Sequence, residues 1–152
     1  MSEGNARGAR YFHAAPILLG EGSVIQPGNW GRILKLYRDA NAVLYREYVL
    51  EQIRASEFPE KPSRFNCVFL LRTYEEAERY RNLCSPLDVI YEVSADTTEG
   101  SIHLGDYNFG GVLPSLQLLE GMPELARKYW AEEPADFVEV LFQGPVVVVT
   151  RC

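Results

Sequence analysis

The sequence predicts one α+β domain with a mixed β-sheet. Apolar and aromatic runs with the period of strands alternate with segments that have the three- and four-residue period of helices. Their order is strand, helix, strand, helix and then several strands, which is typical of the α+β class. At 152 residues the chain is long enough for one such domain. We expect residues 1–9 to form a disordered tail and residues 10–152 to form the domain.

The first half of the chain predicts a short strand followed by the main helix. Aromatic and apolar residues surround His13 in residues 10–19 until Pro16 ends the run. Glycines and prolines in residues 20–31 then indicate a loop. Residues 30–55 follow as a helix, with a break expected near Asn41. The residues expected on its buried face are Ile33, Leu36, Tyr37, Ala40, Leu44, Tyr48 and Ile53.

The middle of the chain predicts a strand that leads directly into a second helix. Residues 63–71 form an aromatic run typical of a buried strand. Thr73 is expected to cap the helix that follows, with acidic residues in its first turn and Ala77, Tyr80 and Leu83 facing inward. Residues 87–95 and 101–109 predict two more strands.

The C-terminal part predicts a loop, a helix from about Pro123 to Trp130, and two strands separated by Gly144-Pro145. The letters LFQGP in this part resemble the site that picornaviral 3C-type proteases cut and that cloning vectors carry. Because they continue into four valines, which are typical of a buried strand, we interpret the segment as a native part of the sheet.

Composition excludes several classes of protein. A net charge of −6 and a pI near 5.0 disfavour a protein that coats nucleic acid, and no apolar run is long enough to span a membrane. The first ten residues do not read as a signal peptide. Three cysteines without a CxxC pair argue against a disulfide framework or a zinc site, so we expect a cytoplasmic protein that binds no metal. Cys67 is expected in the core and His103 at the surface.

No single motif is strong, but four features occur in a specific order. They are His13 in YFHAA, the strand-to-helix unit CVFLLRTYEEAERY, the strand DVIYEVSAD, and Glu139 in VEVLF. This order resembles the ADP-ribosyltransferase superfamily, in particular the branch with a histidine on the first strand that includes poly-ADP-ribose polymerases and the DNA-modifying toxin DarT. The resemblance covers most of the chain. It implies a split, mixed or antiparallel sheet with flanking helices, and NAD as the donor substrate.

The resemblance also implies a role for each residue. Glu139 would be the catalytic carboxylate, because breaking the nicotinamide bond leaves positive charge on the ribose. His13, next to Ala14, would hydrogen-bond the other ribose, and Phe69 or Tyr80 would stack on nicotinamide. Phe69 stands where the family often has tyrosine or serine, with Ser63-Arg64 a few residues earlier. Contacts to the phosphates are expected from Arg64 or Arg32, although a surface salt bridge is the commoner role of an arginine.

The acceptor cannot be read from the sequence, so a protein side chain, a nucleic-acid base and an RNA 2′-phosphate all remain open. By the same resemblance the chain would be a modifier of the toxin, effector or phage type, with delivery into a target cell and a neutralising or inhibitory protein partner as further expectations. The alternatives are an inactive binding protein of the same fold and an NAD glycohydrolase. Taken singly, His13 reads as a core histidine and Glu139 as a residue on the solvated face of a strand.

Overall fold

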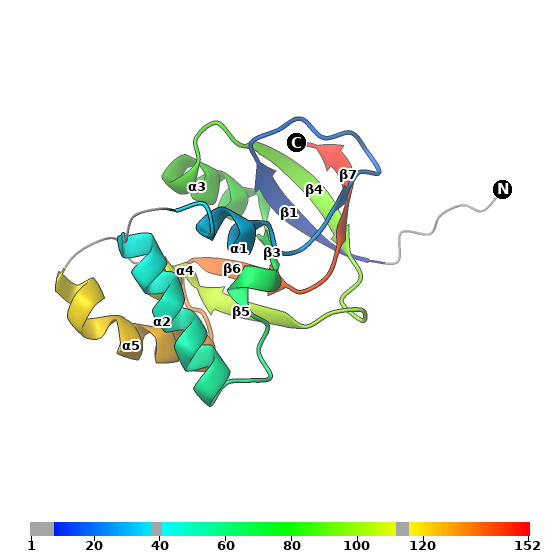
Figure 1. Cartoon of the computed structure of the whole chain (residues 1–152). Coiled ribbons are helices and arrows are strands. Elements are labelled where there is room, and N and C mark those ends of the chain that lie inside the picture. Colours follow the sequence, from blue (N-terminus) through cyan, green and yellow to red (C-terminus); the bar gives the residue numbers. More distant parts are fainter. Residues whose placement is uncertain (1–7, 38–40, 112–115) are drawn as a thin grey trace.

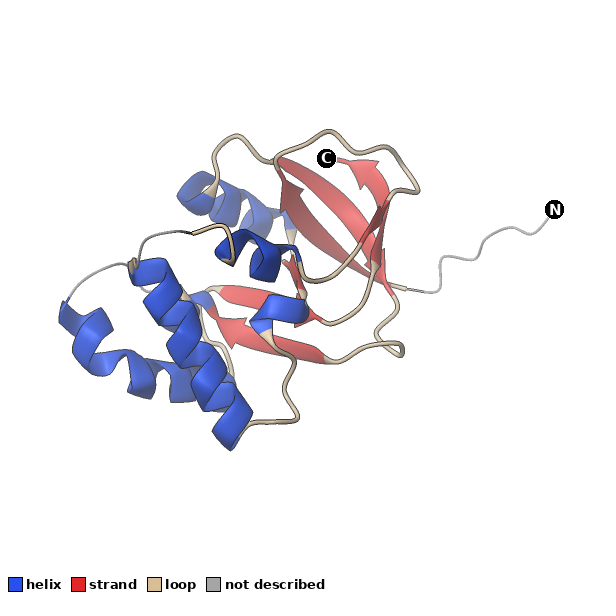
Figure 2. Cartoon of the chain, in the orientation of Figure 1, coloured by secondary structure: helices blue, strands red, loops and turns tan. Residues whose placement is uncertain are grey.

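The computed structural model describes residues 8–37, 41–111 and 116–152, and in these ranges the chain has the predicted α+β fold (Figures 1 and 2). Its strands are β1 (Ala9–Ala15), β2 (Val24–Ile25), β3 (Val68–Leu70), β4 (Val89–Ala95), β5 (Ile102–Asp106), β6 (Val138–Phe142) and β7 (Val146–Arg151). Its helices are α1 (Asn29–Leu34), α2 (Ala42–Glu57), α3 (Tyr74–Cys84), α4 (Tyr107–Gly110), α5 (Leu116–Ala131) and a 3-10 helix (Arg64–Asn66).

The strands form two sheets, so the expectation of a split sheet is confirmed. The orders are β1-β4-β7-β2 and β3-β6-β5, and every pair of neighbouring strands is antiparallel. One sheet is curled into a half-barrel. The sheets meet where Phe12 of β1 and Leu71, just after β3, exchange two backbone hydrogen bonds of 2.8 Å. His13 therefore lies directly at the junction between the sheets.

β6 is the central strand of the second sheet, which confirms that the protease-like letters belong to the fold. All five of its residues are buried, and it pairs with both β3 and β5. Val138, Val140 and Phe142 face the core between the sheets, whereas Leu141 packs against α2 and α5. The valines of β7 are not uniformly buried as expected, since Val147 is 41% exposed. β7 alternates because only one of its faces packs on the core.

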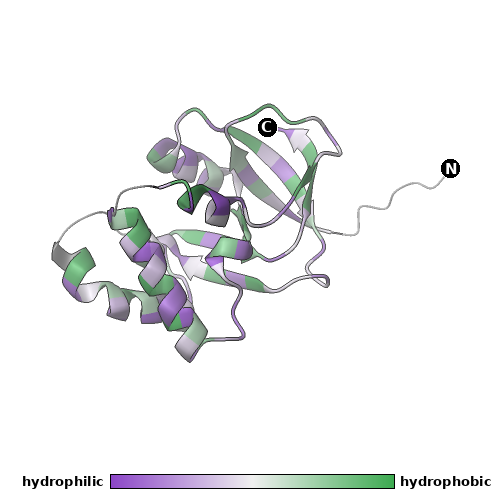
Figure 3. Ribbon diagram, in the orientation of Figure 1, coloured by the Kyte–Doolittle hydropathy of each residue, from purple (hydrophilic) through white to green (hydrophobic). Residues whose placement is uncertain are grey.

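The helices cover different parts of the sheets. α2 and α5 lie side by side and pack against the second sheet through Leu141, whereas α3 packs against β1 and β4 (Figure 1). Figure 3 shows hydrophobic and hydrophilic segments alternating along α2 and α5, as expected for helices with one buried face.

The expected main helix is interrupted before Asn41, close to the predicted break, and so forms α1 and α2, but its buried face was only partly predicted. Asn41 caps α2 by accepting a 3.0 Å hydrogen bond from the backbone N–H of Leu44. Residues 38–40 lie outside the described ranges, so the expectation that Ala40 is buried stays a prediction. Ile33, Leu36, Tyr37 and Tyr48 are exposed, contrary to expectation. The buried side of α2 instead carries Glu47, Val49 and Leu50, because it faces an arginine as well as apolar neighbours.

Two other predicted boundaries are corrected. The strand expected in residues 63–71 is formed only by Val68–Leu70, since Ser63 caps the 3-10 helix by accepting a hydrogen bond from Phe65. The last helix begins at Leu116 instead of near Pro123. Leu118 and Met122 are fully or almost fully buried, and this packing outweighs the disfavoured proline inside the helix.

The second helix agrees with the prediction at its start. Glu76 donates its backbone N–H to the Thr73 hydroxyl at 3.1 Å, so Thr73 is the expected cap. Ala77 is buried and Tyr80 partly buried, but Leu83 is exposed because it lies on the cavity rim.

Residues 1–7 of the expected tail lie outside the described ranges, and β1 begins at Ala9. None of the described helices has the length and apolar character needed to cross a membrane.

Candidate functional site

A cavity of about 1570 Å³ opens along the junction between the two sheets. It exceeds the usual 300–1,000 Å³ of small-ligand pockets, so a dinucleotide could enter it. The predicted residues that line it are His13, Ala14, Arg32, Arg64, Phe69, Tyr80 and Glu139. Ser63 does not line it, because its hydroxyl donates a 2.9 Å hydrogen bond to Glu51 in a separate, smaller pocket. Ser63 is thus better described as a capping residue than as a ligand contact.

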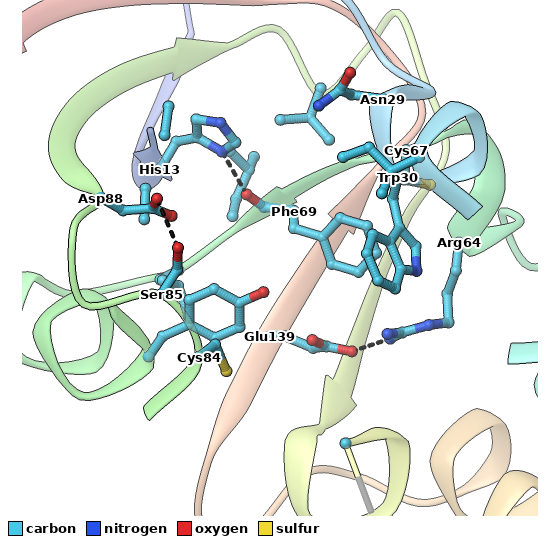
Figure 4. Close-up of a pocket in the computed structure, with 18 of the residues that line it drawn as sticks. His13, Asn29, Trp30, Arg64, Cys67, Phe69, Cys84, Ser85, Asp88 and Glu139 are labelled. Carbon is cyan, nitrogen blue, oxygen red and sulfur yellow. Dashed lines mark hydrogen bonds and ion pairs between the residues drawn. The ribbon is translucent and has the colours of Figure 1, made fainter. Parts of the chain in front are cut away.

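Glu139 is buried in the cavity wall, so it does not lie on a solvated face of its strand. Its exposed fraction is 1%. On β6 it shares the face of Leu141, which points toward α2 and α5. Its Oε1 atom accepts a 2.6 Å hydrogen bond from the Tyr129 hydroxyl. The same atom accepts another from Nη1 of Arg64 (Figure 4). A rigid strand and two donors therefore fix the orientation of this carboxylate.

Arg64 is the centre of a buried ion-pair network rather than a surface residue. It is 4% exposed, and its Nε and Nη2 atoms donate to the two carboxylate oxygens of Glu47 at 2.8 and 2.9 Å. Burial opposes the charge of Arg64, but Glu139 and Glu47 nevertheless raise its pKa well above the ordinary value. Burial alone would raise the pKa of Glu47, but Arg64 and Arg46 lower it. Both residues stay charged at neutral pH.

Tyr129 reaches Glu139 because two glycines let its ring approach. A Cβ at Gly110 would lie 2.7 Å from Cε2 of Tyr129, and a side chain at Gly105 would clash with the same ring. Burial, followed by the nearby Glu139 charge, raises the pKa of Tyr129 well above its ordinary value. The Tyr129 hydroxyl therefore stays protonated and acts as the hydrogen-bond donor to the Glu139 carboxylate.

His13 is held across the junction between the sheets in one tautomer. Its Nδ1 atom lies 2.8 Å from the backbone oxygen of Phe69, and because a carbonyl can only accept, Nδ1 carries the proton (Figure 4). Burial lowers the pKa of His13, although the Phe69 carbonyl and the Asp88 charge partly oppose this. The neutral ring therefore has an unprotonated Nε2 that can accept a hydrogen bond from a hydroxyl.

Aromatic rings form part of the cavity wall. The Arg64 guanidinium lies 4.9 Å from the centre of the Phe69 ring. The Tyr80 ring contacts Tyr107 and Phe137 edge to face, at centroid distances of 5.8 and 6.4 Å. Burial raises the pKa of Tyr80, so it stays protonated. These flat surfaces are suited to a heteroaromatic ring.

Several residues of the site were missed by the sequence analysis. Glu47 and Tyr129 complete the buried network, and Trp30 and Arg46 also line the cavity. The signal for Glu47 was weak: it is a charged residue in the same helical stretch as Leu44 and Leu50. His103, expected at the surface, is only 5% exposed and stacks against Trp130, because β5 is covered by α5.

Cys67 is buried as predicted, and burial raises the pKa of its thiol to about 12. Across the described ranges, no three histidine, cysteine or carboxylate side chains are grouped closely enough to hold a metal ion.

Comparison with known proteins gives one match. Residues 10–152 match the family described as "Protein of unknown function (DUF2441)", and the chain therefore belongs to this family. A search among curated proteins gave no match.

Proposed function

We propose that this member of the DUF2441 family is an NAD-dependent ADP-ribosyltransferase that modifies a macromolecular acceptor, either protein or nucleic acid. The observation that carries the proposal is the fixed carboxylate of Glu139 in the same cavity as His13. The two residues come from strands in different sheets, 126 positions apart in the sequence (139 − 13). Their order along the chain is the one that the superfamily resemblance implies.

The proposed reaction breaks the bond between nicotinamide and ribose, whose electron pair leaves with nicotinamide. Positive charge develops on the ribose, and the negative charge of Glu139 stabilises it. The acceptor then bonds to the ribose carbon and transfers its proton to the Glu139 carboxylate. Tyr129 and Arg64 keep this carboxylate in position throughout, since both bind its Oε1 atom.

The remaining contacts fit the two ends of NAD. His13 would accept a hydrogen bond from a hydroxyl of the adenine-side ribose through Nε2, while Phe69 or Tyr80 would contact the nicotinamide ring. Arg32 lines the cavity and forms no ion pair with any described residue, so its charge is available to a phosphate.

The charge of the cavity differs from that of the whole chain. The charged residues in its wall are Arg32, Arg46, Arg64, Arg79, Asp88 and Glu139, four positive and two negative. The chain as a whole carries −6. Arg46, Arg64 and Arg79 are already paired with Glu47, Glu139 or Asp136, so among the described residues Arg32 is the cation of this wall whose charge can attract an anionic ligand such as NAD.

A second candidate is an inactive protein of the same fold that binds a nucleotide or a partner. The ion pair between Arg64 and Glu139 favours it, because a paired carboxylate offers less charge to a reacting ribose. An NAD glycohydrolase would use water as the acceptor in the same site.

Incubation with NAD labelled in its adenosine half, first alone and then with cell lysate, tests these candidates. We expect a labelled macromolecule, whereas free ADP-ribose would indicate a glycohydrolase and no turnover an inactive protein. Glu139→Gln should lower the rate by about 10² or more, since it removes one preorganised charge. The matched control is Glu92→Gln, a carboxylate on β4 outside the cavity. Transfer at the wild-type rate by folded Glu139→Gln would contradict the proposal.

A further inference from the structure

We infer that Trp30 and Arg46 bind a phosphate group at the Glu139 end of the cavity. In the described part of the chain, two buried side-chain nitrogen atoms lack a hydrogen-bond partner: Nε1 of Trp30 and Nε of Arg46. Both residues line the same cavity as Glu139. Buried donors are almost always paired in folded proteins, so two unpaired donors in one cavity indicate a ligand that completes them.

The chemistry of the two donors restricts the ligand. An indole N–H and a guanidinium N–H can only donate, so the ligand must supply acceptor atoms. The positive charge of Arg46 is only partly balanced by its carboxylate partner. Its Nη2 atom lies 3.2 Å from Oε1 of Glu47, but Arg64 already binds both oxygens of that carboxylate. One carboxylate is thus shared between two arginines, which favours an anionic ligand with several oxygens, such as phosphate.

The position of the two donors relates them to Glu139. Figure 4 shows Trp30 at the end of the site where Arg64 and Glu139 lie, with His13 at the other end. Arg46 and Arg64 both donate to Oε1 of Glu47, at 3.2 and 2.9 Å, and Arg64 also binds Oε1 of Glu139, so Arg46 adjoins the same buried network as Glu139. A phosphate bound here would lie close to the reacting ribose. It belongs either to NAD or to the acceptor, and this step rests on the proposed function.

Isothermal titration calorimetry with inorganic pyrophosphate, NAD and nicotinamide riboside tests the inference. Trp30→Phe removes the N–H donor but keeps an aromatic ring, although a smaller one. Arg46→Lys keeps the charge beside Glu47 but removes Nε. Each should weaken pyrophosphate binding about tenfold, as expected for one lost charge-assisted hydrogen bond. The control is Arg79→Lys, because Arg79 lines the cavity but already pairs with Asp136. It should bind pyrophosphate as the wild type does.

The arms of the experiment separate the two sources of phosphate. If both variants bind NAD more weakly but nicotinamide riboside equally well, the donors hold a phosphate of NAD. If NAD affinity is unchanged while pyrophosphate affinity falls, they hold a phosphate of the acceptor. Pyrophosphate that fails to bind, or binds both variants as it binds the wild type, overturns the inference even if NAD is turned over. Conversely, the expected losses without any turnover support the phosphate site and contradict the proposed enzyme.

Discussion

The two tryptophans of the chain lie in regions of opposite character. Trp130 belongs to the aromatic core behind the cavity, where it is 1% exposed and donates its N–H to the backbone oxygen of Leu50 at 2.9 Å. Its ring centre lies 4.9 Å from that of His103 and 4.8 Å from that of Tyr129. Trp30 lines the cavity, and its buried N–H has no partner among the described residues. The indole N–H is thus hydrogen-bonded in the core and without an acceptor among the described residues in the cavity wall.

The same contrast holds for other polar groups. In the core, His103 donates through Nε2 to the backbone oxygen of Tyr129, and Asp106 accepts from the backbone of Ala135 and Asp136. The cavity instead contains Arg46 with a free Nε and Arg32 without an ion pair to any described residue. A network in which every donor is paired stabilises the fold, whereas unpaired donors can form hydrogen bonds to a bound ligand.

Tyr129 connects the two regions. Its ring packs in the core against Trp130 and His103, while its hydroxyl donates to Glu139 in the cavity wall. The core therefore determines where the candidate catalytic carboxylate lies. Changes in the core should act on stability, and changes in the cavity on binding and turnover, except at the buried charges that belong to both.

The largest effect is expected at Arg64, which is such a charge. Arg64→Met would leave Glu139 buried without a cation and Glu47 with only its longer pair to Arg46, and breaking a buried pair in this way costs about 3–5 kcal/mol of unfolding free energy. Arg79→Met is the control, since its pair with Asp136 is exposed and should contribute about 0–1 kcal/mol. Unfolding in urea measures both. Equal losses would show that the network does not hold the site together.

The importance of Arg64 could not be predicted from sequence, although much of the fold could. The β-branched and aromatic residues of β6 predict a strand of the sheet, and His13, Phe69 and Glu139, whose order was noted in the sequence, line one cavity. Arg64, by contrast, meets partners 17, 65 and 75 positions away in the chain. No local pattern distinguishes such an arginine from a surface one, because only the tertiary fold brings its partners together.

The exposed apolar residues show a similar limit. Tyr48 follows the helical period of α2 and yet is 61% exposed, while Glu47, its neighbour, is buried. Helical periodicity predicts burial from hydrophobicity. It therefore assigns a charged residue such as Glu47 to the exposed face and its apolar neighbour to the buried face. The unpaired donors of Trp30 and Arg46 are likewise invisible in the sequence, since they are defined by what is missing around them.

A smaller effect is expected in the core as pH falls. Burial lowers the pKa of His103 from its ordinary 6.5 to about 4. As pH falls below 6.5, His103 is therefore protonated in the unfolded chain, whereas in the folded chain it stays neutral until about pH 4. The unfolding free energy decreases over this range. Between pH 7 and pH 5 this group should account for about 2 kcal/mol of the loss.

His103→Gln provides the matching variant, because glutamine can donate to the same carbonyl but does not titrate. Urea unfolding at pH 7 and pH 5 should show a smaller loss for His103→Gln than for the wild type. His13, whose pKa is also lowered by burial, is present in both proteins and cancels in this difference. Identical losses would indicate that His103 is accessible to protons in the folded state.

The smallest and most direct comparison replaces each tryptophan with phenylalanine. Trp130→Phe leaves the Leu50 carbonyl without its donor and opens space in the core, which should cost about 1–3 kcal/mol of unfolding free energy. Trp30→Phe removes a donor that is already unpaired and shortens a ring that is only partly buried, so it should cost less, about 0–1 kcal/mol. Pyrophosphate should then stabilise the wild type more than Trp30→Phe in the same urea titration, because at one ligand concentration a tighter ligand stabilises the folded state more. Similar losses for the two variants without ligand would show that the Trp30 N–H is already satisfied, and the contrast between core and cavity would disappear.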